Sequence, residues 1–276
     1  MPPASRPPVD LRNDANHPLV LRYAEIHESA LLDGCLAHGR AQPSLCMNTS
    51  TPFYRAARRA VEHGIDRPDA VDLVREALRA YYDQVQPSSA AEWLGLGADA
   101  AVALQTAPPW AAVFPWRART LDSYRMAYEK AAYEENRATG RDRGIEDGWL
   151  FCGPVSGEKM QIEAERIVYV LRRIAHTGYQ RSDDPDGDVK ATALVNENME
   201  WRWLITAGNH RASAAAALGY ASIPIRVNLV ISRADAPFWR HVRERLFSLS
   251  QALSIFDNIF NGRPTPLADA WLRNPA

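Results

Sequence analysis

The segment that most constrains the fold of this chain is a glycine turn and an alanine-rich helix between two strand patterns. It reads Ala207-Gly-Asn-His-Arg-Ala-Ser-Ala-Ala-Ala-Ala-Leu-Gly219. Trp201–Thr206 before it is a short strand candidate. After it, apolar residues recur at every second position from Ile223 to Ile231, the period of a strand with one buried face. The small side chains from Ala212 to Ala217 let the helix pack closely, so the segment predicts a sheet with this helix against it.

The start of this helix has the chemistry of an anion site. The first amides of a helix have no partner within it, and the helix dipole places partial positive charge at that end. Gly208 allows the backbone to approach a phosphate closely. Arg211 can fork onto phosphate oxygens, and His210 can donate from an imidazole nitrogen.

The remainder of the second half alternates between helix and strand patterns. Apolar residues from Met160 to Ala175 form one helical stripe within residues 157–177, which Gly178 ends. Lys190–Val195 and Trp201–Thr206 are predicted to pair as a hairpin. Gln180–Asp188 reads as an acidic loop, and the chain returns to helix from Pro237 to about Gly262.

The first half reads almost entirely as helix. Thr51-Pro52 is a capping residue followed by proline at the first helical position, and Gly64 marks the stop. Further helices are expected over residues 68–85, after Ser88-Ser89, and from Thr120 to Gly140. The proline-rich residues 107–116 are expected to be extended, with their aromatic side chains packed across another element.

These patterns predict an α+β protein in three parts. Residues 1–147 form a mostly helical N-terminal region, residues 148–234 a small mixed-sheet domain, and residues 235–276 a helical tail. The aromatic residues of the tail indicate packing onto the core: Phe247, Phe256, Phe260 and Trp271.

Composition narrows the class of protein. The chain has 276 residues and a formal net charge of −1, which weighs against a surface coated in basic charge for DNA. Its three cysteines lie far apart with no Cys-x-x-Cys, so neither a zinc cluster nor a disulfide framework is expected. No apolar run approaches the ~18 residues of a membrane span. The Pro-rich, polar residues 1–14 do not read as a secretory signal, so we expect a cytoplasmic protein without membrane partners.

Residues Trp203–Val227, with Gly-x-His-Arg at their centre, resemble the signature of the ParB/sulfiredoxin-like fold. The resemblance extends over roughly residues 150–231 and excludes the N-terminal half. It implies that Gly208, Asn209, His210 and Arg211 bind the phosphates of ATP or another nucleoside phosphate, with the Ser213 hydroxyl in the first turn.

The family includes different chemistries. Sulfiredoxins carry a nucleophilic Cys between the glycine and the histidine, whereas this chain has Asn209, whose amide cannot attack; a sulfiredoxin activity is therefore rejected. The partition proteins bind CTP and continue into a helix-turn-helix, and the tail here shows no such recognition helix. Small-molecule kinases use the same turn. A further group, of unknown role and encoded with cell-surface polysaccharide genes, is similar in its Gly-Pro-Val-Ser start and Trp-x-x-Val tail, which points to a pathway context and not to a reaction.

The resemblance thus implies a Mg²⁺-dependent phosphotransferase acting on a small polar metabolite or a sugar-pathway intermediate. The base that takes the acceptor proton is expected among Glu163, Glu165 and Asp184. The two glutamates also read as first-turn acids that favour the helix dipole. The acidic loop that holds Asp184 reads either as a Mg²⁺ site acting through phosphate oxygens or as a solvent-exposed turn.

A different class of function stays open at this point. The same turn fits a nucleotide-binding switch or scaffold that engages DNA or a protein partner and performs no metabolic chemistry. The near-neutral charge weighs against DNA. The oligomeric state does not follow from the sequence.

Overall fold

One mixed sheet contains strands from both halves of the chain. The computed structural model describes residues 8–24, 29–138, 140–181 and 187–274. Within them, seven strands lie in the order β1-β2-β9-β7-β8-β3-β4, and β5 and β6 form a separate pair. The strands are β1 Val9–Asp10, β2 Ala30–Cys35, β3 Gly39–Ala41, β4 Leu45–Cys46, β5 Gly148–Trp149, β6 Cys152–Val155, β7 Val189–Val195, β8 Trp201–Ala207 and β9 Ser222–Ser232.

The centre of the sheet confirms the strand predictions. β7 and β8 form the expected antiparallel hairpin, and β9 lies parallel to β7 on its other side. The turn between β7 and β8 is closed by Asn196, whose Oδ1 accepts from the amides of Asn198 and Glu200. This Asx pattern explains why the polar stretch between the two strands makes a tight turn.

The prediction that the first half is almost entirely helical is wrong for residues 9–46. β2 pairs antiparallel with β9, and β3 pairs parallel with β8, so the sheet crosses the predicted boundary at residue 147. Two glycines allow this pairing. A Cβ at Gly34 would lie 2.8 Å from Ile225, and one at Gly39 would lie 2.6 Å from Trp203.

Two helices of the first half, α1 and α3, begin where capping residues predict, whereas the short α4 was not predicted. Thr51 caps α1 (Pro52–His63) by accepting from the Tyr54 amide, and Gly64 ends it. Ser89 caps the short α3. The other helices of this half are α2 Ala70–Gln84, α3 Ala90–Trp93, α4 Val102–Thr106 and α5 Leu121–Ala138, with 3₁₀ turns at Pro18–Tyr23, Leu36–His38, Pro109–Ala111 and Ile145–Asp147.

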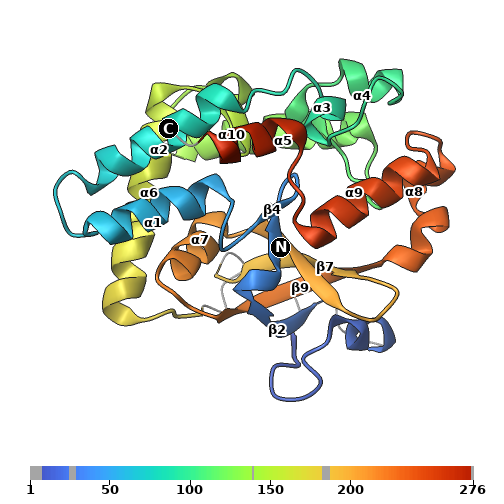
Figure 1. Cartoon of the computed structure of the whole chain (residues 1–276), viewed down its shortest axis with the longest axis horizontal. Coiled ribbons are helices and arrows are strands. Elements are labelled where there is room, and N and C mark those ends of the chain that lie inside the picture. Colours follow the sequence, from blue (N-terminus) through green and yellow to red (C-terminus); the bar gives the residue numbers. More distant parts are fainter. Residues whose placement is uncertain (1–7, 25–28, 139, 182–186, 275–276) are drawn as a thin grey trace.

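Helix α7 (Asn209–Ala217) lies between the sheet and a layer of helices (Figure 1). Its residues Ala212, Ala215 and Ala216 belong to the core on the sheet side. Ala214 and Ala217 belong to the core of the helical layer. Because alanine covers both sides of α7, it packs closely against α1 and α6 (Gly157–Thr177) on the side away from the sheet.

The C-terminal tail packs onto the core, as its aromatic residues predict. It consists of a 3₁₀ helix Arg233–Phe238, α8 Arg240–Arg243, α9 Leu249–Asn261 and α10 Pro266–Arg273. Phe247, Phe256, Phe260 and Trp271 are all buried. Trp116 of the proline-rich segment meets Trp239 edge to face at 5.2 Å, which joins that segment to the tail.

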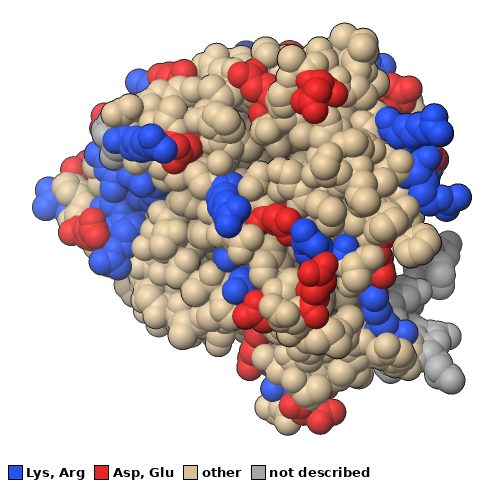
Figure 2. Space-filling view, turned by 45° about the vertical axis from the view of Figure 1, so that its right-hand side comes forward, with Lys and Arg blue, Asp and Glu red and all other residues tan. Residues whose placement is uncertain are grey.

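The surface carries charges of both signs. On the face shown in Figure 2, Lys and Arg residues are interspersed with Asp and Glu residues, with broad uncharged areas between them. Among the described residues, no helix is both long enough and apolar enough to span a bilayer.

Candidate functional site

The turn between β8 and α7 has the geometry that its glycine predicts. Gly208 has φ +89°, a left-handed conformation, and a Cβ there would lie 3.1 Å from Val189 on the neighbouring strand. The first helical bond runs from the amide of Ala212 to the carbonyl of Gly208. The amides of Asn209, His210 and Arg211 precede that bond and therefore have no acceptor within the helix. They form the mouth of α7.

His210 is held against a buried carboxylate of α6. Its Nε2 lies 2.5 Å from Oε2 of Glu163. The Glu163 side chain is 2% exposed, whereas that of His210 is 21% exposed. On α1, the Phe53 ring stacks on the imidazole with centroids 4.8 Å apart and an interplanar angle of 20°. Three helices therefore fix the orientation of one partly exposed imidazole.

The electrostatics of this pair favour an ionised carboxylate. Burial by itself raises the pKa of Glu163, but the hydrogen bond from His210 and the positive charges nearby outweigh burial and lower that pKa. Besides His210, the charges belong to Arg166, whose Nη1 lies 3.2 Å from Oε1, and to Lys159. An ionised Glu163 accepts a hydrogen bond from the Nε2–H group of His210. This leaves Nδ1 as the ring nitrogen that is available to a ligand.

Lys159 and Phe53 belong to this cluster although the sequence did not single them out. Lys159 lies one helical turn before Glu163 on the same face of α6 and is 6% exposed. Among the described residues, no carboxylate lies within ion-pair distance of its ammonium. The signal for Lys159 was its spacing of four residues from Glu163, which places both on the buried stripe of the predicted helix.

Arg211 extends the positive charge at the mouth of α7. Its Nη1 is buried and has no hydrogen-bond partner within the described chain. The guanidinium lies close to Tyr179, where burial raises the phenol pKa to about 12 and the charge of Arg211 acts in the opposite direction. A buried guanidinium nitrogen without a partner is an open donor for an anionic oxygen.

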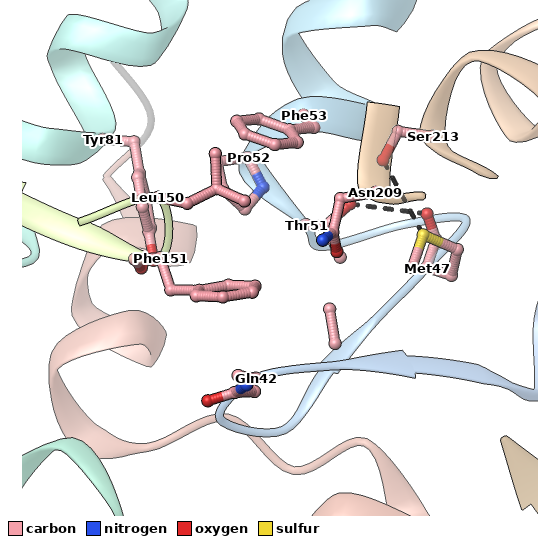
Figure 3. A pocket seen from close by; sticks show the side chains of 11 residues that line it. Gln42, Met47, Thr51, Pro52, Phe53, Tyr81, Leu150, Phe151, Asn209 and Ser213 are labelled. Atoms are coloured by element: carbon pink, nitrogen blue, oxygen red, sulfur yellow. Dashed lines mark hydrogen bonds between the residues drawn. The ribbon is translucent and has the colours of Figure 1, made fainter. Parts of the chain in front are cut away.

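A cavity lies between the mouths of α7 and α1. Asn209 and Ser213 of α7 line it together with Thr51, Pro52 and Phe53 at the start of α1. In Figure 3, these side chains face Leu150 and Phe151 across the space, and Gln42 closes one end. The remaining lining residues are Ala41, Met47 and Tyr81. The cavity volume is about 20 Å³.

The other predicted carboxylates lie elsewhere. Glu165 is exposed and accepts from Gln161 at 2.8 Å, because two helical positions carry it away from the face that holds Glu163. Asp184 lies outside the described residues. Asp188, at the end of the same acidic loop, is buried between Arg181 at 3.0 Å and Arg226 at 2.7 Å.

The described residues do not bring metal-binding side chains together. Among them, no group of three or more His, Cys, Asp or Glu side chains is placed to hold a metal ion. Asp188 forms ion pairs with Arg181 and Arg226, and its Oδ2 accepts a hydrogen bond from Arg226, so two positive charges lie where a Mg²⁺ ion would bind.

Comparisons with protein-family models, with curated proteins and with solved structures found no match to this chain. The resemblance of residues 150–231 to the ParB/sulfiredoxin-like fold therefore stays a prediction from the sequence. The fold itself is a mixed α/β arrangement built on a mixed sheet.

Proposed function

We propose that this protein is a nucleotide-dependent phosphotransferase acting on a small polar metabolite or a sugar-pathway intermediate. The observation that carries the proposal is the pairing of His210 with the buried carboxylate of Glu163 at the mouth of α7. A helix mouth supplies phosphate binding, and an oriented imidazole supplies proton transfer. Phosphoryl transfer needs both in one place.

The phosphate-binding part consists of Gly208, the first amides of α7 and Arg211. The left-handed conformation of Gly208 brings the chain close to Val189 and turns it directly into α7, so the first amides of the helix follow the turn at once. The unpartnered Nη1 of Arg211 adds a charged donor beside them. These residues fit the polyphosphate of ATP or another nucleoside phosphate.

The structure suggests different roles for the two members of the pair. Glu163 is buried and bonded to His210, so it acts as a positioning residue that fixes the ring and its tautomer. His210 is the member with exposed surface, and its Nδ1 is the group assigned to accept the acceptor proton or to donate to a phosphate oxygen. This arrangement follows the general logic of an orienting carboxylate behind a catalytic imidazole.

A nucleotide-binding experiment tests the phosphate site. Thermal unfolding is measured with ATP, ADP, CTP and GTP, with and without Mg²⁺, because no Mg²⁺ ligand set lies among the described residues. A ligand at a hundredfold excess over its dissociation constant stabilises the folded state by ~2.7 kcal/mol. Arg211→Ala is expected to lose this effect, and Arg173→Ala, which removes an exposed arginine of α6, is expected to keep it. Absence of stabilisation by every nucleotide contradicts the proposal.

A turnover experiment tests the chemistry. Purified protein with nucleotide and a metabolite extract is expected to form a new phosphorylated compound, and His210→Asn is expected to bind nucleotide but lose product formation by about 10²–10⁴-fold. Nucleotide binding without turnover in the wild type contradicts a phosphotransferase and supports the switch. In that case, nucleotide-dependent retention on DNA or on a protein partner is the measurement that follows.

A further inference from the structure

The cavity between α1 and α7 has an uncharged lining in an otherwise charged neighbourhood. None of its lining residues is Asp, Glu, Lys, Arg or His. Its polar side chains are Gln42, Thr51, Asn209 and Ser213, with the Tyr81 hydroxyl donating to the carbonyl of Phe151. Neither Glu163 nor His210 lines the cavity, although the Phe53 ring stacks on His210 and also lines it.

Two polar groups of the wall have unused hydrogen-bonding capacity. The carboxamide of Asn209 has no partner in the part of the chain that the structure describes. Ser213 is 1% exposed, and its hydroxyl reaches only the sulfur of Met47 at 3.7 Å, which is a weak acceptor. An amide and a hydroxyl together offer both donors and acceptors. They match a ligand group that also donates and accepts.

The volume of the cavity limits which ligand groups fit into it. The cavity has a volume of about 20 Å³. On the same measure, one water molecule needs ~10–15 Å³. The space therefore admits one or two non-hydrogen atoms. A hydroxyl or hydroxymethyl group fits this space, whereas a carboxylate with its attached carbon is larger.

The charges around the cavity also favour an uncharged ligand group. The lining has no cationic side chain to pair with a carboxylate, so only the helix ends would offset the cost of its burial, and the group is also too large for the space. An ammonium would face the positive ends of two helices, because Thr51 and Gly208 cap α1 and α7 at this point. The rings of Phe53 and Phe151 and the Met47 side chain suit a methylene group.

We propose that this cavity seats the hydroxymethyl end of an uncharged polyol, with Asn209 and Ser213 bonding its oxygen. The assignment of that polyol as the phosphoryl acceptor rests on the proposed function. Asn209 and His210 are adjacent in the first turn of α7, so the seat for the acceptor and the proposed phosphate site share one helix mouth.

Matched ligands test the chemistry of the cavity without nucleotide. The probes are 1,3-propanediol, malonate and 1,3-diaminopropane, which have the same chain length and identical groups at both ends. Binding is followed by the amide chemical shifts of Thr51 and Ser213. The diol is expected to bind in the millimolar range, and the other two about tenfold more weakly at these residues. Equal or tighter binding of either charged probe at these residues overturns the inference.

Matched variants test its location. Ser213→Val fills the cavity and removes the hydroxyl, and Ser254→Val makes the same change on the exposed face of α9. The first is expected to weaken diol binding about tenfold, and the second to leave it unchanged. Asn209→Leu provides the same test if Ser213→Val does not fold. Diol binding that survives both cavity substitutions, or that is absent in the wild type, overturns the inference.

The two proposals fail in different ways. Nucleotide binding that depends on Arg211, without diol binding, contradicts only the proposal that the cavity binds a polyol. Diol binding that depends on Ser213, without any nucleotide binding, supports the polyol-binding cavity and contradicts the proposed phosphotransferase.

Discussion

At the scale of residues, the candidate site depends on which side of a helix a carboxylate occupies. Glu163 and Glu165 were equal candidates in the sequence, yet two positions on a helix point in nearly opposite directions. Glu163 lies between Met160 and Ile167 on the buried stripe of α6, so it faces His210. The buried stripe of this helix is visible in the sequence. Glu163 lies on the stripe and Glu165 does not, so the stripe distinguishes the two glutamates.

Glu163→Gln is expected to destabilise the protein by about 2 kcal/mol at neutral pH, because it removes the charge of a buried hydrogen bond. The pKa of Glu163 is lowered in the folded state, so its stabilisation is present above the ordinary value of 4.5 and is lost as the pH falls through the folded pKa. Urea unfolding at about pH 7 and about pH 4 is therefore expected to show a gap between wild type and variant that narrows in acid. Glu165→Gln serves as the exposed control, and an equal loss in both variants contradicts the assignment.

Gly208→Ala is expected to cost more than its backbone strain alone. A non-glycine residue in the left-handed region costs ~1–2 kcal/mol, and here the added Cβ also meets Val189 at 3.1 Å. Gly219 has a similar φ of +86° with nothing within 4 Å, so Gly219→Ala measures the strain by itself. Thermal or urea unfolding of the two variants gives the difference. Equal losses would show that contact with Val189 does not constrain the turn.

At the scale of elements, prediction succeeded where the signal is local. The starts of α1 and α3 follow from Thr51-Pro52 and Ser88-Ser89, and the turn at Gly208 follows from its own residues. β2 was missed because Ala30–Cys35 lacks alternation and is stabilised by β9, far along the chain. Phe53 was missed for the same reason: only the packing of α1 against α7 brings it to His210.

Two helices that begin with the same Thr-Pro dipeptide provide a matched test of capping. Thr51 accepts a hydrogen bond from the Tyr54 amide, whereas Thr265, before α10 (Pro266–Arg273), makes no side-chain capping bond. Thr51→Ala is expected to cost about 1 kcal/mol, and Thr265→Ala clearly less. Denaturant midpoints of the two variants measure this, and a reversed order would contradict the role of Thr51 as the cap of α1.

At the scale of the whole molecule, residues 1–147 and 148–234 do not divide the sheet between them. β2 and β3 flank the strands of the second half on both sides, and α1 and α2 cover α6 and α7. The boundary predicted between residues 147 and 148 marks a change from helical patterns to alternating helix and strand patterns in the sequence. It does not mark the edge of a core, because one cluster of buried residues runs from Phe53 to Trp271.

A fragment of residues 148–234 is therefore expected to show no cooperative unfolding. The fragment lacks β2, which pairs with β9, and β3, which pairs with β8. It also exposes the alanines of α7 that pack on α1. A chain that starts at residue 29 retains β2 to β9 and is expected to unfold in one transition. Circular dichroism on heating distinguishes them, and a cooperative transition in the short fragment would show that the second half has an independent core.

The pairing of β2 with β9 also affects biosynthesis. Cys35 leaves the ribosome long before its partner Ser222 and the end of β9 at Ser232. At ~5–20 residues per second, the interval is roughly 10–40 s. During this interval the nascent β2 has no partner strand on its β9 side. We therefore expect the sheet to be completed only after most of the chain has been synthesised, and the nascent chain to depend on chaperones until then.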